Sequence, residues 1–392
     1  MNSSINPTQK LYLVLDLDHT LLNTTRIENL TSEEEYIRSQ KFSDSDLFML
    51  KNSISMTKLR PFVHMFLEEA SKMFELCIWT KGTRNYALEM AQFLDPKNIY
   101  FQTRIFSREN CTQLHQKTLD VLNISEEFIL VLDDTKEVWE KHMGNVIEID
   151  RYYYFDSSCR KFGFKNRKSL CHMKKDEDES DGSLACSLRV LKTVHSEFFG
   201  NGLNEVDKDV RYVLKKVRKK VLNGCKILFD TQESTKLVRM NYGVWEMAKE
   251  MGATCTINKL DCDITHVISL HCGTKESLWA LQEGKFLVNA KWVKTAFYFW
   301  QRLLENDFPV RKVKSINLFK PTVIHEMFGK IKLFKPIVLK CLLRNIYFFD
   351  YDPCEPYWDG SRITSTRSKD AKQGNESYSS NEADPTTEEE ET

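Results

Sequence analysis

The feature that most constrains the fold is the alternation of short apolar runs with helical patterns over the first part of the chain. An apolar run of about six residues suits a strand buried on both faces, and strands that alternate with helices form parallel sheets with right-handed crossovers. The candidate strands are residues 11–16, 74–80, 99–106, 128–134 and 145–150. The spacing of apolar residues predicts helices over 62–73 and 86–94. The sequence therefore predicts an α/β domain with a parallel sheet and flanking helices over residues 8–156.

Composition sets limits on the partners. The chain has 392 residues, which corresponds to two or three domains of about 150 residues. Its 56 Lys and Arg balance its 56 Asp and Glu, so the whole chain carries no charge that would attract nucleic acid or an anionic membrane. Eleven Cys without a CxxC pair and a polar amino terminus indicate reduced thiols in an intracellular protein. We expect a soluble protein with no direct nucleic-acid contact and no membrane partner.

The rest of the chain divides by composition. Residues 157–207 form a charged linker with a helical segment, and its acidic block KKDEDESDG (174–182) is expected to stay solvated. A helix and a second, smaller strand–helix pattern follow over 208–308. Residues 309–357 match no fold that we can assign. The acidic tail, 358–392, has almost no apolar residues, so we predict that it is disordered.

Acidic side chains stand where two of the predicted strands end. Asp16 and Asp18 end the first strand, Thr80 ends the second, and Asp133 and Asp134 end the fourth. In an open parallel sheet, ligands bind beyond the carboxyl ends of the strands. Carboxylates gathered there repel one another unless a cation holds them, and oxygen ligands without His or Cys favour Mg²⁺. The sequence therefore predicts a magnesium site at this edge, built by these four acids.

The spacing of the first acid pair suits phosphoryl transfer. Side chains two residues apart in an extended segment share a face, so one carboxylate can attack phosphorus while the other protonates the departing oxygen. Thr20 and Thr80 offer hydroxyl donors, and Lys117, on a helical pattern before the fourth strand, supplies the positive charge that such a reaction requires. A DxD sequence alone is more often a turn or a helix cap. The combination of all these residues favours a catalytic site.

With those residues in place, residues 10–156 resemble the haloacid dehalogenase superfamily, and within it the Fcp/Scp-type protein phosphatases. The segments that carry the resemblance are DLDHTLL, KLRPFVHMFL, WTKGTRNYA and VLDDTKEVW. The resemblance implies an Mg²⁺-dependent serine/threonine phosphatase. In it, Asp16 would form an aspartyl-phosphate, Asp18 would act as acid and then base, and Thr80 and Lys117 would hold the phosphoryl group. The Asp16 carboxylate, the Asp18 carbonyl and Asp134 would ligate the metal, with Asp133 supporting Lys117 or the metal.

The resemblance also implies a substrate. The stretch to residue 308 looks like the plant C-terminal-domain phosphatase-like proteins, which implies action on phosphoserine in the heptad-repeat tail of RNA polymerase II, in the nucleus. The gaps at 23–57 and 80–117 are too short to hold a full cap domain. A site without a large cap is open, and an open site suits a phosphorylated polypeptide.

Residues 221–308 resemble a BRCT domain through the segments NGCKILF, MGATC and THVI and through Trp292, which we expect in the core. BRCT domains often bind phosphopeptides through a hydroxyl after the first strand and a lysine on the second helix. Here Asp230 replaces the hydroxyl and Lys275 stands one place early, so we expect protein docking, with general transcription factors among the partners, or weak phosphate binding. The nearby Cys and His residues match no zinc pattern; they are Cys255, Cys262, His266, His271 and Cys272.

Several alternatives stay open from the sequence. The chain could be a catalytically weak scaffold that binds the polymerase tail or transcription factors, or a small-molecule phosphatase, although the gap lengths oppose the latter. Arg60 and Arg84 could bind substrate phosphates or pair with surface acids. The segment KKVRKK (215–220) could be a nuclear import signal or the solvated face of an amphipathic helix.

Overall fold

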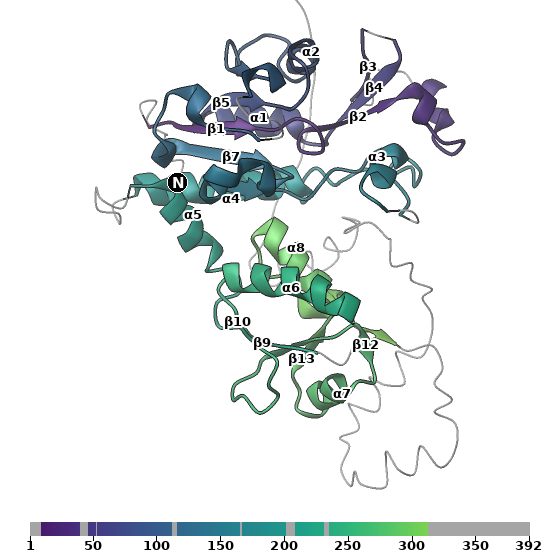
Figure 1. Cartoon of the computed structure of the whole chain (residues 1–392), viewed down its shortest axis with the longest axis vertical. Helices are drawn as coiled ribbons and strands as arrows, with labels where there is room; N and C mark the ends of the chain where they lie inside the picture. Colours follow the sequence, from purple (N-terminus) through teal and green to yellow (C-terminus); the bar gives the residue numbers. More distant parts are fainter. Residues whose placement is uncertain are drawn as a thin grey trace, which may run out of the picture.

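The computed structural model describes residues 9–39, 46–51, 53–111, 116–164, 167–200, 208–230 and 235–312. Figure 1 shows two α/β units, the first coloured purple to teal and the second green. The predictions for the tail, 358–392, and for nearly all of segment 309–357 lie outside the described residues. No helix in the described ranges has the length and apolar character that crossing a membrane requires.

The first unit is built on a parallel five-stranded sheet, which confirms the predicted fold class. Its strand order is β6-β5-β1-β7-β8. The strands are β1 (Leu11–Leu15), β5 (Phe74–Trp79), β6 (Ile105–Phe106), β7 (Ile129–Asp133) and β8 (Val146–Glu148). Leu15 of β1 stands level with Ile78 of β5 and Leu132 of β7. The three central strands therefore end together, and the residues that follow them meet at one edge.

One predicted strand is much shorter than expected. Of the apolar run 99–106, only Ile105 and Phe106 pair with β5. The Asp95 carboxylate accepts hydrogen bonds from the backbone N–H groups of Ile99, Tyr100 and Phe101. Those N–H groups are therefore not available to a sheet, and the segment forms a turn.

Helices cover the sheet because successive side chains of a strand point to opposite faces. Leu11, Leu13 and Leu15 of β1 belong to one core cluster, which also includes residues of the four flanking helices, while Val14 belongs to the cluster on the other face. The four helices are α1 (Val63–Ser71), α2 (Arg84–Leu94), α4 (Ser183–Phe199) and α5 (Val210–Arg218). The opposite face is covered by the 3-10 helical segment η7 (Lys136–Asn145), which contributes the buried Trp139.

A small antiparallel sheet that the sequence did not predict follows β1. Its order is β2-β4-β3, with β2 (Leu22–Arg26), β4 (Ser55–Leu59) and β3 (Leu47–Met49). Figure 1 shows it projecting beyond the end of the main sheet, with α3 (Asp156–Lys161) nearby. The polar sequence LNTTR of β2 carries no apolar alternation, which is why the strand was missed; its β-branched threonines were the available signal.

The acidic block 174–182 is not solvated throughout, so that expectation is wrong. Glu177 forms a salt bridge with the fully buried Arg60 at 2.7 Å, and Asp176 pairs with Lys58 at 3.1 Å. The Tyr152 hydroxyl also donates a hydrogen bond to Asp176 at 2.8 Å. Buried cations within the first unit provide partners that a sequence pattern of charges cannot show.

The second unit has the strand–helix order expected of a BRCT domain. Its parallel sheet has the order β10-β9-β11-β13, with β9 (Lys226–Phe229), β10 (Thr254–Thr256), β11 (His266–Ile268) and β13 (Phe286–Val288). The helices are α6 (Thr235–Glu250), α7 (Lys275–Gln282) and α8 (Lys291–Phe299), and the short strands β12 (His271–Cys272) and β14 (Arg311–Lys312) pair separately. Trp292 is fully buried, as predicted, and its ring stacks on His266 with centroids 4.6 Å apart.

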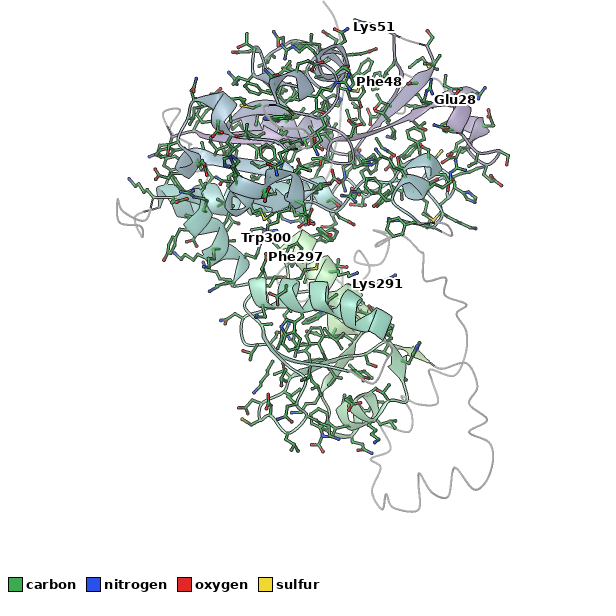
Figure 2. All side chains as sticks on the ribbon, in the orientation of Figure 1. Glu28, Phe48, Lys51, Lys291, Phe297 and Trp300 are labelled. Atoms are coloured by element: carbon green, nitrogen blue, oxygen red, sulfur yellow. The ribbon has the colours of Figure 1, made fainter. Side chains whose placement is uncertain are left out.

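The two units contact each other through α8 and the end of α5. Phe297 and Trp300 of the second unit lie at this junction (Figure 2), where the Arg218 guanidinium stands 4.4 Å from the Trp300 ring centroid. Arg218 also donates hydrogen bonds to Glu250 at 2.7 Å and to the Val146 carbonyl at 3.4 Å. Part of the basic segment 215–220 is therefore engaged in packing between the units.

Candidate active site

The carboxylates that follow β1 and β7 converge because these strands are neighbours in the sheet. One oxygen from each of Asp16, Asp133 and Asp134 lies within 4.8 Å of the others, and all three residues are buried. In the part of the chain that the structure describes, this is the group of acid, Cys or His side chains placed to hold a metal ion. The Cys and His residues between 255 and 272 form no such group there.

Lys117 neutralises part of this charge. Its Nζ donates hydrogen bonds to Asp16 Oδ1 at 2.5 Å and to Asp133 Oδ2 at 2.7 Å, and the side chain is buried between the rings of Trp79 and Trp139. The residue lies in a segment without regular secondary structure rather than on the predicted helix, and its backbone N–H donates to the Val138 carbonyl. A short hydrogen-bonded connection thus aims the ammonium at the acids.

Burial and charge oppose each other in this cluster. Burial raises the pKa of Asp16 well above its usual range, against the attraction of Lys117, and the nearby charges of Asp133 and Asp134 raise it further. Burial lowers the pKa of Lys117, but the two carboxylates beside it outweigh burial and raise that pKa overall. The lysine therefore stays charged, and the site as a whole favours the addition of positive charge.

Asp18 stands apart from these three acids. Its carboxylate accepts a hydrogen bond from the Tyr86 hydroxyl at 2.7 Å, and Tyr86 also bonds Thr24 of β2 at 2.7 Å. Burial raises the pKa of Asp18, and the hydrogen bond from Tyr86 opposes that rise. The chain turns directly after Asp18, where His19 adopts a left-handed conformation (φ 69°). Two acids that are close in sequence thus have separate environments, as an acid and a nucleophile require.

Thr80 lies at the end of β5, next to β1. The side chain is buried, and its hydroxyl accepts a hydrogen bond from the Gly82 backbone N–H at 3.0 Å. Lys81, the following residue, was not singled out from the sequence. Burial and the charge of Lys117 lower the pKa of the Lys81 ammonium, and Asp133 and Asp16 act in the opposite sense. Lys81 is therefore within electrostatic reach of the same cluster.

Two more residues of the site were missed by sequence reasoning. Arg151, shortly after β8, forms a salt bridge with the Asp134 carboxylate and donates hydrogen bonds to the Asp134 carbonyl at 3.2 Å and to Thr135 Oγ1 at 2.7 Å. The available sequence signal for Arg151 was its position shortly after a strand. Strand β8 is the neighbour of β7, so residues that follow the two strands lie at the same edge of the sheet. Tyr86 had no comparable signal: it is an apolar-face position of α2.

Arg60 and Arg84 make structural contacts. The Arg60 guanidinium donates to the carbonyls of Thr20 and Asp150 at 3.0 and 2.7 Å, in addition to its salt bridge with Glu177. It thereby fixes the loop that carries Asp18. Arg84 donates to the Ile105 carbonyl. In the described residues, both arginines are engaged by the protein itself.

The donor set fits Mg²⁺, and the hydrogen bonds divide the acids into two kinds. Both oxygens of Asp133 accept from protein donors, which are Thr135 N–H, Lys117 and Trp139. Among the described residues, Asp16 Oδ2 accepts only a weak bond from Thr20 at 3.4 Å, and Asp134 Oδ1 accepts none. Asp16 and Asp134 therefore retain the acceptor capacity that a hard cation needs, while Asp133 orients Lys117.

Comparison with known proteins identifies the class. Residues 11–196 match the family of NLI interacting factor-like phosphatases. Two solved structures of the RNA polymerase II CTD phosphatase Fcp1, the second from fission yeast and bound to beryllium fluoride, share the fold. Their sequence identities are 22% and 23%, their TM-scores are 0.58 and 0.60, and each comparison covers 77% of this chain and 96% of the other. Fold and site together define a protein phosphatase.

Curated relatives narrow the family. RNA polymerase II C-terminal domain phosphatase-like 4 of Arabidopsis thaliana is 47% identical over 78% of this chain and 71% of its own length. Phosphatase-like 3 of the same plant is 36% identical over 77% of this chain but only 25% of its own length. The chain belongs to the family of RNA polymerase II C-terminal domain phosphatase-like proteins, which confirms the resemblance drawn from its motifs.

Proposed function

We propose that this chain is an Mg²⁺-dependent protein serine phosphatase that acts on phosphoserine in the C-terminal domain of RNA polymerase II. The names of its relatives support the substrate. The observation that carries the chemistry is the contact of the Lys117 ammonium with Asp16 at 2.5 Å, inside a cluster of buried acids. A buried carboxylate next to a buried cation is a nucleophile whose position is fixed before substrate arrives.

The reaction proceeds in two displacements. The Asp16 carboxylate attacks phosphorus, the bond to the seryl oxygen breaks, and Asp18 gives that oxygen its proton, which leaves free serine and an aspartyl-phosphate. Asp18 then takes a proton from water, whose oxygen attacks phosphorus and releases phosphate and the Asp16 carboxylate. Lys117 and the Thr80 hydroxyl stabilise the phosphoryl oxygens, and Tyr86 holds Asp18 in place.

The metal would bind at Asp16, the Asp18 backbone carbonyl and Asp134. When bound, Mg²⁺ supplies positive charge for the phosphoryl oxygens and offsets the repulsion between the acids. This assignment is supported by the free acceptor positions on Asp16 and Asp134 and by the absence of nitrogen or sulfur ligands in the described cluster.

Further proposals concern the cell and the second unit. The substrate places the protein in the nucleus. We propose that the BRCT domain docks protein partners, general transcription factors among them. The sequence set its unit at 208–308 and the catalytic domain at 8–156. The packing of α4 and α5 in the core of the first unit supports a catalytic unit that extends to Arg218 and a docking unit that begins after it.

The test is the turnover of a phosphoserine heptad peptide by the purified full chain with Mg²⁺. Asp16→Asn should abolish phosphate release while the circular dichroism spectrum stays unchanged. Asp46→Asn, at an exposed acid before β3, is the matched control and should keep wild-type turnover. Equal activity of wild type and Asp16→Asn would refute the enzyme. Peptide binding without turnover in the wild type would favour a scaffold.

A further inference from the structure

A group of rings and cations lies outside the catalytic cluster and next to it. This aromatic–basic rim consists of Tyr153, Lys161, Phe162, Phe164 and Arg167. The Tyr153 ring stands edge-to-face with Phe162 and with Phe164, each with centroids 5.6 Å apart. The Arg167 guanidinium lies 4.3 Å from the Tyr153 centroid, and Lys161 Nζ lies 5.7 Å from that of Phe162. The rim is therefore a continuous group of edge-to-face rings and positive charges in which Tyr153 is buried and Phe164 is exposed.

The backbone turns between Phe162 and Phe164, so these two rings can point in different directions. Gly163 has φ +82°, a conformation that L residues rarely adopt, and it separates Phe162 from Phe164. Phe162 lies inward, edge-to-face with His19 at 5.1 Å. Phe164 remains 36% exposed. One ring therefore contacts the catalytic loop, and the other faces solvent beside it.

The rim adjoins Asp18, the acid proposed to protonate the leaving seryl oxygen. Burial raises the pKa of Asp18, while the Tyr86 hydrogen bond and the charges of His19 and Lys161 lower it. The geometry agrees with this effect, because Lys161 lies against Phe162 and Phe162 contacts His19, the residue after Asp18. Phe162 also lies 4.0 Å from the Arg151 guanidinium, which binds Asp134. The rim thus lies beside both the loop that carries Asp18 and the Arg151 side chain that binds Asp134.

The positive charges of the rim are not neutralised by close ion pairs. No carboxylate of a described residue lies within 4.0 Å of the cationic nitrogens of Lys161 or Arg167. Arg167 Nε is buried and has no hydrogen-bond partner among the described residues. Lys161 is exposed at the end of α3. Arg167 also acts electrostatically on the buried Asp150 and lowers the pKa of that carboxyl against the effect of burial. The exposed Lys161 is therefore the rim cation best placed to bind an anionic group of a substrate.

We propose that the aromatic–basic rim binds the peptide segment next to the phosphoserine, with a proline side chain against Phe164 and a second phosphoserine at Lys161. This inference rests on the proposed function. Because the serine under attack sits at Asp18, its flanking residues must cross the neighbouring surface. The exposed ring of Phe164 can pack against a proline side chain, and the exposed Lys161 ammonium complements phosphate.

The experiment compares two substrates on the full chain with Mg²⁺. One is a heptad peptide with two phosphoserines, and the other is p-nitrophenyl phosphate, which has no flanking peptide. Lys161→Ala and Phe164→Ala should each raise the KM for the peptide about five- to tenfold. Phe164→Ala should leave kcat/KM for the aryl phosphate unchanged, and Lys161→Ala should change it less than it changes kcat/KM for the peptide. Lys161→Ala should also remove the preference for a doubly over a singly phosphorylated peptide.

Matched controls lie far from the rim. Lys97→Ala removes an exposed lysine, and Phe128→Ala removes a 40% exposed ring at the opposite edge of the sheet, just before β7. Both should leave the peptide KM unchanged. Lys161 is exposed, so its variant tests the proposal even where Phe164→Ala folds poorly.

Two results would overturn the inference. An unchanged peptide KM in Lys161→Ala would show that the rim does not bind substrate. An equal loss on both substrates would show that the rim only supports the catalytic loop. A wild-type chain that hydrolyses neither substrate would instead refute the proposed function, so the two failures are distinguishable.

Discussion

In the described residues, two parallel sheets have central strands that end in acids, and one of the two gathers a cluster of acids around a lysine. After β1 comes Asp16, which meets Lys117, Asp133 and Asp134. After β9 comes Asp230, which is also buried, but its carboxylate accepts a hydrogen bond from Ser269 Oγ at 2.8 Å. Ser269 follows β11 and so occupies the position that the acid pair occupies after β7.

This comparison shows that the sheet edge provides a place and the following residues provide the chemistry. Both edges collect the residues that follow neighbouring strands. At the first, acids arrive from two strands and a lysine arrives from a connection. At the second, an acid and a hydroxyl bond each other, which suits a structural role or docking.

We expect the largest effect from removing Lys117, the cation that distinguishes the sheet edge after β1 from the sheet edge after β9. Lys117→Met should reduce kcat on a phosphopeptide about 1000-fold, because the phosphoryl oxygens lose a preorganised positive charge. Lys226→Met, at a partly exposed lysine of β9 that lies 3.9 Å from Asp261, is the control and should keep wild-type kcat. Steady-state phosphate release measures both. Turnover of Lys117→Met within tenfold of the wild type would contradict the comparison.

The metal provides the next test. Chelation of the wild-type chain should stop turnover, and added Mg²⁺ should restore it. Asp134→Asn should require about 10- to 100-fold more Mg²⁺ for half-maximal activity, because one charged ligand is lost. Asp230→Asn changes the same residue type at the second edge and should leave the Mg²⁺ requirement unchanged. If Asp134→Asn and Asp230→Asn raise the Mg²⁺ requirement equally, the metal does not bind specifically at the first edge.

The independence of the two cores can be tested by stability. Trp292→Ala should cost the second unit about 3–5 kcal/mol of unfolding free energy, because it empties a fully buried indole site. Hydrolysis of p-nitrophenyl phosphate should persist. Phe66→Ala, at a fully buried ring of the first core, should lower both stability and hydrolysis. Urea unfolding followed by circular dichroism and by activity separates the cases. A single transition in which Trp292→Ala loses both signals would show that the contact between the units joins them into one cooperative structure.

The smallest effect concerns that contact, where Glu148 of β8 accepts a hydrogen bond from the Tyr298 hydroxyl of α8 at 3.5 Å. Burial raises the pKa of Glu148 to about 7 from 4.5, with Glu137 adding to the rise and with Lys136 and Arg218 opposing it. Between these values the folded state binds more protons than the unfolded state, so the unfolding free energy falls as pH rises from about 4.5 to about 7, by at most about 3 kcal/mol. Glu148→Gln should flatten this dependence in urea unfolding at pH 5 and pH 8. Glu283→Gln, at an exposed position, should not. An unchanged slope in Glu148→Gln would show that the dependence arises elsewhere.

Much of the first unit and the clustering of its acids could be predicted because the signals are local. Apolar runs identified β1, β5 and β7, and acids directly after two of them identified the edge where a ligand would bind. Lys117 was also predicted as a residue of the site, although in the described residues it does not lie on the helix that the sequence predicted. The strand predicted over the apolar run 99–106 was wrong for most of its length. The Asp95 carboxylate accepts hydrogen bonds from three backbone N–H groups of this run, which a strand would need for the sheet.

What the sequence determined by itself was the order of strands and helices and the chemical type of each residue after a strand, since both follow from short-range periodicity. Only the tertiary structure decided which partners those residues have. Tyr86 reaches Asp18 across 68 positions, and Arg60 reaches Glu177 across 117. Such pairs form because packing the helices and the small antiparallel sheet onto the main sheet brings distant groups together, and a buried charge or hydroxyl must then find a partner in that space.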